Sequence, residues 1–170
     1  MLTKEAIEKY FLAEKAASWI FMAIGIAGML LAIFAFCFFK TFFFKGAAIP
    51  LLLIGLLLGV VGFTVCKKSD KDRIRNVYAL TMNPGEIKEK ELSRMEVVMK
   101  NFVVYRYVEI ALALLGIGLF FYFNNNQAQT FWKGFGMALA IMALLALTAD
   151  YFAEKRGHVY IDQLKGFVNK

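Results

Sequence analysis

The stretch AASWIFMAIGIAGMLLAIFAFCFF, residues 16–39, decides the fold class, because its 24 residues include no charged side chain. As an α-helix rising ~1.5 Å per residue it would be about 36 Å long, enough to cross a hydrocarbon core of ~30 Å. It is too long for the core of a signal peptide, and Phe36 stands before Cys37, where lipoprotein cleavage needs a small residue. We therefore expect a retained transmembrane helix.

Three further apolar stretches follow. Residues 46–66 are uncharged, residues 102–123 contain only Arg106 and Glu109 as charged residues, and residues 132–152 contain only Lys133 and Asp150. The chain has 170 residues, of which 60% are hydrophobic, and this is too apolar for a soluble domain of that length. The sequence predicts an all-α integral membrane protein, a four-transmembrane-helix bundle that forms one membrane domain over residues 1–170.

Lysine and arginine predict which side of the membrane each connecting segment faces, since these residues resist translocation. Seventeen of the 20 lie in residues 1–15, in the connection 67–101, at the start of the third stretch or in the tail 153–170. The other three are Lys40, Lys45 and Lys133. We expect an N-in/C-in topology with a helical cytoplasmic connection. The compact size and the basic edges favour a bacterial inner membrane.

Both terminal segments have apolar residues at helical spacing. In residues 1–15 these are Ile7, Tyr10 and Phe11. In the tail they are Ile161, Leu164 and Val168. We expect an N-terminal amphipathic helix, capped by Thr3, that lies on the lipid headgroups, and a short amphipathic helix after Gly157. In the connection, Ser93 and Glu96 match a capping box that would begin the helix leading into the third span.

The two halves of the chain resemble each other. An offset of 88 residues aligns Lys45-Gly46 with Lys133-Gly134 and Lys67-Lys68 with Lys155-Arg156. The pattern predicts two duplicated helical hairpins. Because each hairpin crosses twice, the halves would be related by an axis along the membrane normal.

Few residues could support catalysis or hold a cofactor. Cys37 and Cys66 would lie ~30 Å apart across the bilayer, whereas a disulfide needs Cα atoms within ~7 Å. His158 is the only histidine, so a haem held by two histidines and a closed zinc site are excluded. Ser18 is the only serine in a predicted span, far from His158. We expect no enzyme, no catalytic or metal-binding residue and no cofactor.

Glu109 and Asp150 are the acids to notice, because carboxylates inside a span are costly and commonly functional. Both would lie in the inner third of the bilayer. Arg106 precedes Glu109 by three residues on one helix face, so we expect a local ion pair near the headgroups. A structural role and a proton- or cation-linked role both remain open.

Three other sets of residues are candidates for contacts. Small residues that let helices approach closely are Gly28, Gly55, Gly59 and Gly136. Aromatic residues placed for an outer interfacial belt or a partner are Phe42, Phe43, Phe44, Phe131 and Trp132. The basic run after the second span comprises Lys67, Lys68, Lys71, Arg73 and Arg75, which would orient the chain and attract anionic lipid.

Two functions remain. The first is a non-enzymatic protein that acts by protein–protein interaction in the bilayer, as an accessory subunit of a membrane complex or, by analogy alone, as an immunity protein against a pore-forming toxin. An expected absence of buried polar residues favours it. The alternative is a small oligomeric ion- or proton-coupled transporter or channel using Glu109 and Asp150. Either implies lipid and a protein partner or a second copy as partners, and not nucleic acid, since the cations form no compact face.

Overall fold

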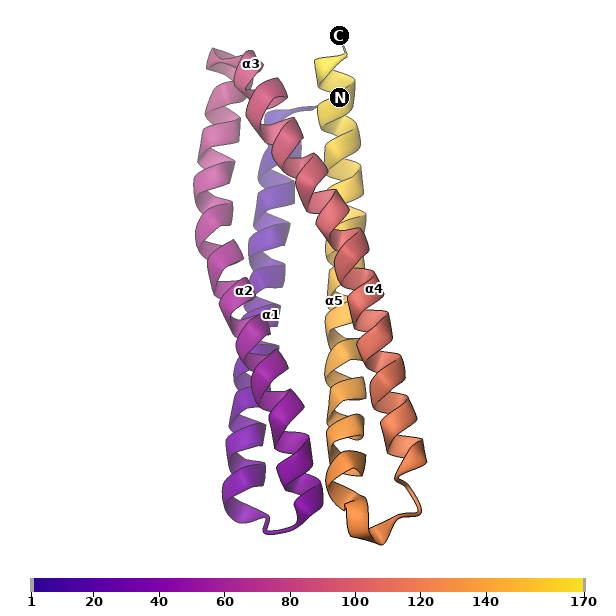
Figure 1. Cartoon of the computed structure of the whole chain (residues 1–170). Helices are drawn as coiled ribbons and strands as arrows, with labels where there is room; N and C mark the ends of the chain where they lie inside the picture. The colour runs from indigo at the N-terminus through magenta and orange to yellow at the C-terminus, as the bar shows by residue number, and fades with distance from the viewer. Residues whose placement is uncertain (1, 170) are drawn as a thin grey trace.

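The computed structural model describes residues 2–169, and within that range the chain is helical with no strand. The long helices are α1 (Lys4–Phe38), α2 (Phe42–Met82), α4 (Ser93–Tyr122) and α5 (Thr130–Val168). Between α2 and α4 lie the short α3 (Pro84–Glu86) and a π-helix, η1 (Ile87–Leu92). A 3-10 turn, η2 (Gln127–Gln129), precedes α5. The helices lie side by side as an elongated bundle (Figure 1).

Four helical segments are long and apolar enough to cross a membrane: α1, α2, the continuous run Pro84–Tyr122, and α5. Large apolar side chains are exposed along their middles, for example Leu30, Leu53 and Leu114. Lipid, and not water, suits such a surface. The prediction of an all-α protein with four potential spans is confirmed, and the fold is consistent with a multi-pass membrane protein.

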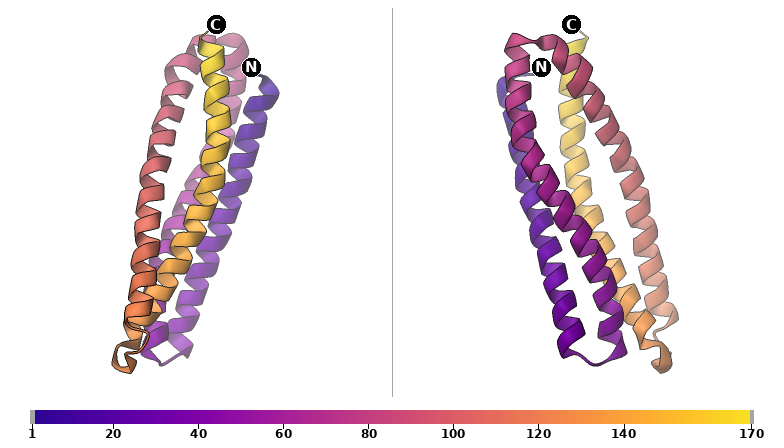
Figure 2. Two further views of the ribbon diagram at one scale, coloured as in Figure 1. Left: turned by 90° about the vertical axis from the view of Figure 1, so that its right-hand side faces the viewer. Right: turned by 60° about the vertical axis from the view of Figure 1, so that its left-hand side comes forward.

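The bundle consists of two hairpins. Helix α1 packs along α2, α4 packs along α5, and the hairpins meet where α2 and α1 contact α5. Within the described residues, the backbone of α4 does not come close to that of α1 or α2, although Arg94 and Met95 of α4 contact side chains of α1 at the terminal end. Both termini and α3 lie at one end of the bundle, here called the terminal end, and the two short connections lie at the other, the loop end (Figures 1 and 2).

Glycines allow the helices to approach closely. A Cβ atom on Gly25 would lie 2.5 Å from the carbonyl oxygen of Gly55, and one on Gly136 would lie 2.6 Å from that of Gly116. Gly28 also faces α2, since its Cβ would lie 3.3 Å from the Leu51 oxygen. Gly59 is different, because its Cβ would meet only the Met29 side chain, at 3.7 Å.

The contact between the hairpins at the loop end is reciprocal. A Cβ atom on Gly46 of α2 would lie 2.0 Å from the carbonyl oxygen of Phe131, and one on Gly134 of α5 would lie 2.0 Å from that of Phe43. The 88-residue offset relates Gly46 to Gly134 and also Phe43 to Phe131. Each hairpin therefore uses equivalent positions to contact the other.

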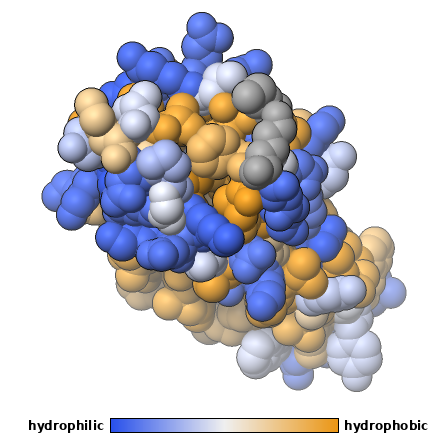
Figure 3. Space-filling view, turned by 90° about the horizontal axis from the view of Figure 1, so that it is seen from above, coloured by the Kyte–Doolittle hydropathy of each residue, from blue (hydrophilic) through white to orange (hydrophobic). Residues whose placement is uncertain are grey.

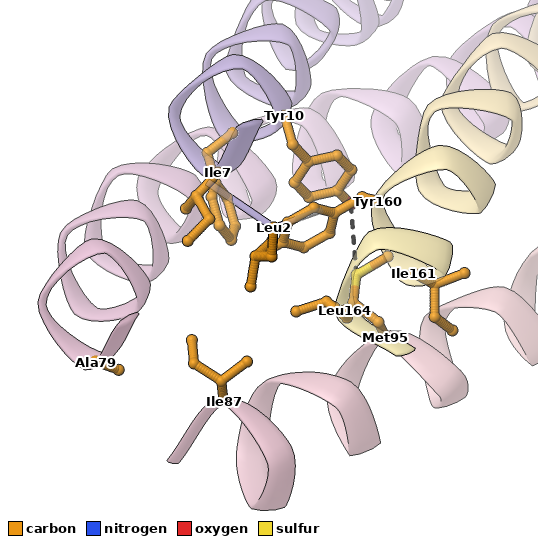
Figure 4. Close-up of a cluster of buried hydrophobic side chains, with 10 residues drawn as sticks. Leu2, Ile7, Tyr10, Ala79, Ile87, Met95, Tyr160, Ile161 and Leu164 are labelled. Carbon is orange, nitrogen blue, oxygen red and sulfur yellow. Dashed lines mark hydrogen bonds between the residues drawn. The ribbon is translucent and has the colours of Figure 1, made fainter. Parts of the chain in front are cut away.

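The terminal end holds the largest apolar cluster, here called the terminal core. It comprises Leu2, Ile7, Tyr10, Phe11, Ala79, Ile87, Met95, Tyr160, Ile161 and Leu164. Figure 4 shows side chains from α1, α2, η1, α4 and α5 converging there. The rings of Tyr10 and Tyr160 stack with centroids 4.1 Å apart, and the Tyr10 hydroxyl lies 3.6 Å from the Met95 sulfur. Seen from above, hydrophilic residues surround this apolar centre (Figure 3).

The terminal core corrects three expectations. The apolar faces of residues 1–15 and of the tail pack against protein, so they are not available for headgroups. Neither segment is a separate helix, because α1 runs from Lys4, where Thr3 caps it, and α5 continues past Gly157 to Val168. The capping box is also wrong: the chain is already helical from Pro84, and Ser93 makes no cap hydrogen bond. Positions 1 and 170 of the predicted segments lie outside the described residues.

Candidate functional site

A cavity of ≈ 490 Å³ lies between the two hairpins, with side chains from α1, α2, α4 and α5 in its wall. On α4 the lining runs from Arg94 to Leu112, a rise of about 27 Å. The cavity is therefore elongated along the bundle.

The chemical character of the lining changes along the cavity. Polar and charged residues gather toward the terminal end: Tyr10, Glu14, Ser18, Lys68, Asp72, Arg94, Asn101 and Arg156. The far part is apolar, with Phe21, Ile54, Leu58, Leu112 and Ala143. Tyr105, Glu109 and Asp150 lie between them. The cavity is therefore amphipathic along its length.

Glu109 of α4 and Asp150 of α5 meet in this cavity, where their carboxyl groups face each other. The Glu109 Oε2 atom is buried and has no hydrogen-bond partner. Among the described residues, neither carboxylate forms an ion pair with a basic side chain. Two acids without a basic partner in apolar surroundings form a site that a proton or a cation would stabilise.

Arg106 does not pair with Glu109, so that expectation is wrong. Its Nη2 atom lies 3.4 Å from Oε1 of Glu154 on α5, and Nε2 of His158 lies 3.6 Å from the same oxygen. Glu154 is buried, which makes a partner necessary, and Arg106 supplies it from the neighbouring helix. This pair lies in a second hollow of ≈ 430 Å³. Its wall includes Arg106, Glu154 and Asp150 together with apolar residues of α4 and α5.

A buried polar network, which the sequence analysis missed, closes the terminal end of the cavity. Glu91 of η1 is fully buried and accepts hydrogen bonds from Arg94 at 2.7 and 3.0 Å and from Arg75 of α2 at 3.2 Å. Arg75 also pairs with the buried Asp72 at 3.3 Å. Although burial lowers the pKa of Arg94, its hydrogen bonds to Glu91 and the charge of Glu91 raise it overall. The network ties α2 to the start of α4.

The basic run after residue 66 is not one free patch. Arg73 lies 3.7 Å from Asp70 and Arg75 contacts Asp72 and Glu91, whereas Lys67, Lys68 and Lys71 are exposed. Lys15 of α1 donates a hydrogen bond to Asp70, and this bond holds the pKa of that carboxyl below its usual range. Ser69 donates to Glu14 at 2.6 Å. Alternating charges in the sequence signal ion pairs, but they do not identify the partners.

The aromatic residues at the loop end pack on one another. Phe44 stacks on Phe39 with centroids 4.1 Å apart, and Trp132 meets Phe131 edge-on at 5.4 Å. Phe42 and Trp132 are exposed, whereas Phe43, Phe44 and Phe131 are half-buried. Phe43 and Phe131 act through their backbones, which contact the glycines of the opposite hairpin.

Residues that could hold a metal do not gather anywhere in residues 2–169, where no group of three or more His, Cys, Asp or Glu side chains is so arranged. Cys37 and Cys66 are both free thiols.

Fold and cavity together define a class: a helical bundle with four potential membrane spans and an acidic, amphipathic cavity between its two hairpins. Comparisons with family models, with curated proteins and with solved structures returned no match for this chain.

Proposed function

We propose that this protein is a small membrane carrier that binds a cation or protons at Glu109 and Asp150. The observation that supports the proposal is the meeting of the two carboxyl groups in the cavity between the hairpins, without a basic partner. Their surroundings make two neighbouring negative charges costly, so the binding of one cation or one proton would lower that cost. Exchange of a proton for a cation at this pair would link the movement of the two species.

The expected absence of buried polar residues, which favoured an interaction protein, is wrong. Asp72, Asn76 and Glu91 are buried at the terminal end, and the acid pair lies within the predicted spans. Polar residues at such sites are costly and are commonly retained for a function. The carrier therefore becomes the leading proposal.

Proteoliposomes test the carrier directly. We expect the wild-type protein to exchange internal protons for an external organic cation, followed with an enclosed pH-sensitive dye. Glu109→Gln and Asp150→Asn remove the acids with little change in shape. Each should reduce the exchange at least about tenfold, because a loss of binding free energy equivalent to roughly one pKa unit or more weakens binding by that factor. Glu96→Gln, on an exposed position of α4, is the matched control. Undiminished exchange in both acid variants would rule the mechanism out.

A second candidate, an accessory or immunity-type protein that binds another membrane protein, is supported by the exposure of α4. Only 11% of its most apolar window is buried, against 39% for α5. A partner helix, or a second copy of this chain, would cover the rest. Purification in mild detergent tests this candidate: a stoichiometric partner would support it, and a monodisperse single chain would argue against it.

We also propose that both termini face the cytoplasm, that the membrane is a bacterial inner membrane and that the hairpins arose by duplication. The distribution of lysine and arginine supports the orientation. The reciprocal contacts of Gly46 and Gly134 support the duplication. With Cys37 and Cys66 replaced by alanine, cysteines at the exposed positions Glu5 and Asn125 test the orientation in intact cells, where an impermeant maleimide should reach only the second.

A further inference from the structure

The cavity is closed toward the terminal end. Tyr10, Asp72 and Arg94 form its last lining there, and they belong to the terminal core and to the polar network around Glu91. These residues are packed or ion-paired, so along the bundle axis the cavity ends at a folded layer of protein. Lys68 and Asn101 also line this part and are exposed, so water reaches it from the side.

The cavity is open to the side, between α2 and α4. Leu57 and Val61 on α2 and Tyr105 and Val108 on α4 line it, yet they are 61%, 43%, 50% and 51% exposed. All four lie in the predicted spans, where the surroundings are hydrocarbon. Figure 2 shows α2 and α4 standing apart along this side. This part of the opening therefore faces lipid.

The opening is a departure from the internal symmetry. If one hairpin is placed on the other, α4 takes the place of α1 and α5 takes the place of α2. The contact between α1 and α5 then corresponds to a contact between α4 and α2. The backbones of α1 and α5 come close, whereas in the described residues those of α4 and α2 do not, and the helical run that leads into α4 meets α2 at α3 and η1. The opening therefore lies where one of two equivalent contacts is missing.

Shape and charge restrict the ligand. A cavity of ≈ 490 Å³ that extends along about 27 Å of α4 has room for one extended alkyl chain. Lys68 and Arg156 line the terminal end and have no acidic partner among the described residues, so they repel a positive headgroup from that end. The acids Glu109 and Asp150 attract it to mid-cavity, and the apolar far part accommodates the chain.

We propose that the ligand is a single-chain alkyl cation that enters from the bilayer between α2 and α4, with its charged group at Glu109 and Asp150 and its chain in the apolar part of the cavity. This inference rests on the proposed carrier function and adds the class of substrate and the route.

Binding to the protein in nanodiscs tests the class of ligand. The probe is radiolabelled dodecyltrimethylammonium, and dodecyl sulfate, with the same chain and the opposite charge, is its comparison. We expect saturable binding of the cation, weakened at least about tenfold by Glu109→Gln or by Asp150→Asn. Equal affinity for both probes, or tighter binding of the anion that is lost on replacing Lys68 and Arg156 with glutamine, would overturn the assignment.

The route is tested with two matched substitutions on α4. Val108→Trp places a bulky ring at the opening, whereas Val104→Trp adds the same ring one turn away, at a position that is 56% exposed and does not line the cavity. We expect Val108→Trp to slow association and dissociation of the cation by about tenfold. Val104→Trp should leave both rates within about twofold of wild type. Unchanged rates in Val108→Trp would contradict lateral access.

The two proposals fail in different ways. If the acid variants lose the cation but Val108→Trp does not slow it, the carrier site stands and the route is wrong. If neither acid variant affects binding or proton exchange, the carrier function itself is wrong.

Discussion

Individual glycines fix how the hairpins meet. Gly46 and Gly134 each lie so close to a backbone carbonyl that any Cβ atom would overlap it, and a carbonyl cannot move aside as a flexible side chain can. Among the described glycines, these two positions, which are 88 residues apart, therefore leave the least room for a side chain.

We expect Gly46→Ala or Gly134→Ala to destabilise the bundle by roughly 1–3 kcal/mol, the usual range for overpacking. Thermal unfolding in a fixed detergent measures the effect. Gly118→Ala is the matched control, because open space surrounds its Cβ position on α4, and it should be neutral or slightly stabilising through helix propensity. Equal stability of all three variants would mean that the hairpins do not pack as described.

The acid pair illustrates what a sequence leaves open at single residues. Glu109 and Asp150 could be singled out, because charged residues are rare in apolar stretches. Their meeting could not be predicted, since they are 41 positions apart and the register of α4 on α5 decides whether they face each other. The same applies to Arg106, for which the local partner Glu109 was expected and Glu154 on the neighbouring helix was found.

Helices as elements were easier to predict in their cores than at their ends. An uncharged run of 24 residues has one solution in lipid, because only a helix satisfies its own backbone there. Outside lipid that constraint disappears. Helix α2 continues from residue 66 to Met82, and α1 begins at Lys4, because their charged extensions still carry one apolar face each for the terminal core. Packing between these faces is a tertiary property that periodicity alone does not assign to protein or to headgroups.

The π-helix η1 depends on Glu91, its only fully buried acid. Replacement by Gln keeps the shape but leaves Arg94 and Arg75 without their shared anion in a protected site. We expect Glu91→Gln to cost about 3 kcal/mol, the lower end of the range for breaking a buried pair, because Arg75 is partly exposed and solvent screens it. Thermal unfolding checks this, and Glu89→Gln, exposed on the same element, should change little. A similar loss in both variants would contradict a specific role for the network.

The whole molecule combines a closed side with an open one. The backbones of α1 and α5 come close, whereas in the described residues those of α4 and α2 do not, so an arrangement in which α4 leans onto α2 would enclose the cavity. We expect a cation at the acid pair to favour that arrangement, because neutralising Glu109 would lower the cost of burying this face of α4.

Spin labels can follow this movement. Cysteines at Val60 on α2 and Tyr107 on α4 are exposed and lie outside the cavity lining, and Cys37 and Cys66 would be replaced by alanine. We expect dodecyltrimethylammonium to shorten the distance between these labels by several Å, about the travel of one helical turn. Labels at Ile33 on α1 and Leu144 on α5, across the closed side, should keep their distance. Because closure acts through Glu109 and Asp150, the shortening should vanish in Glu109→Gln, and a change that persists there would separate the movement from the acid pair.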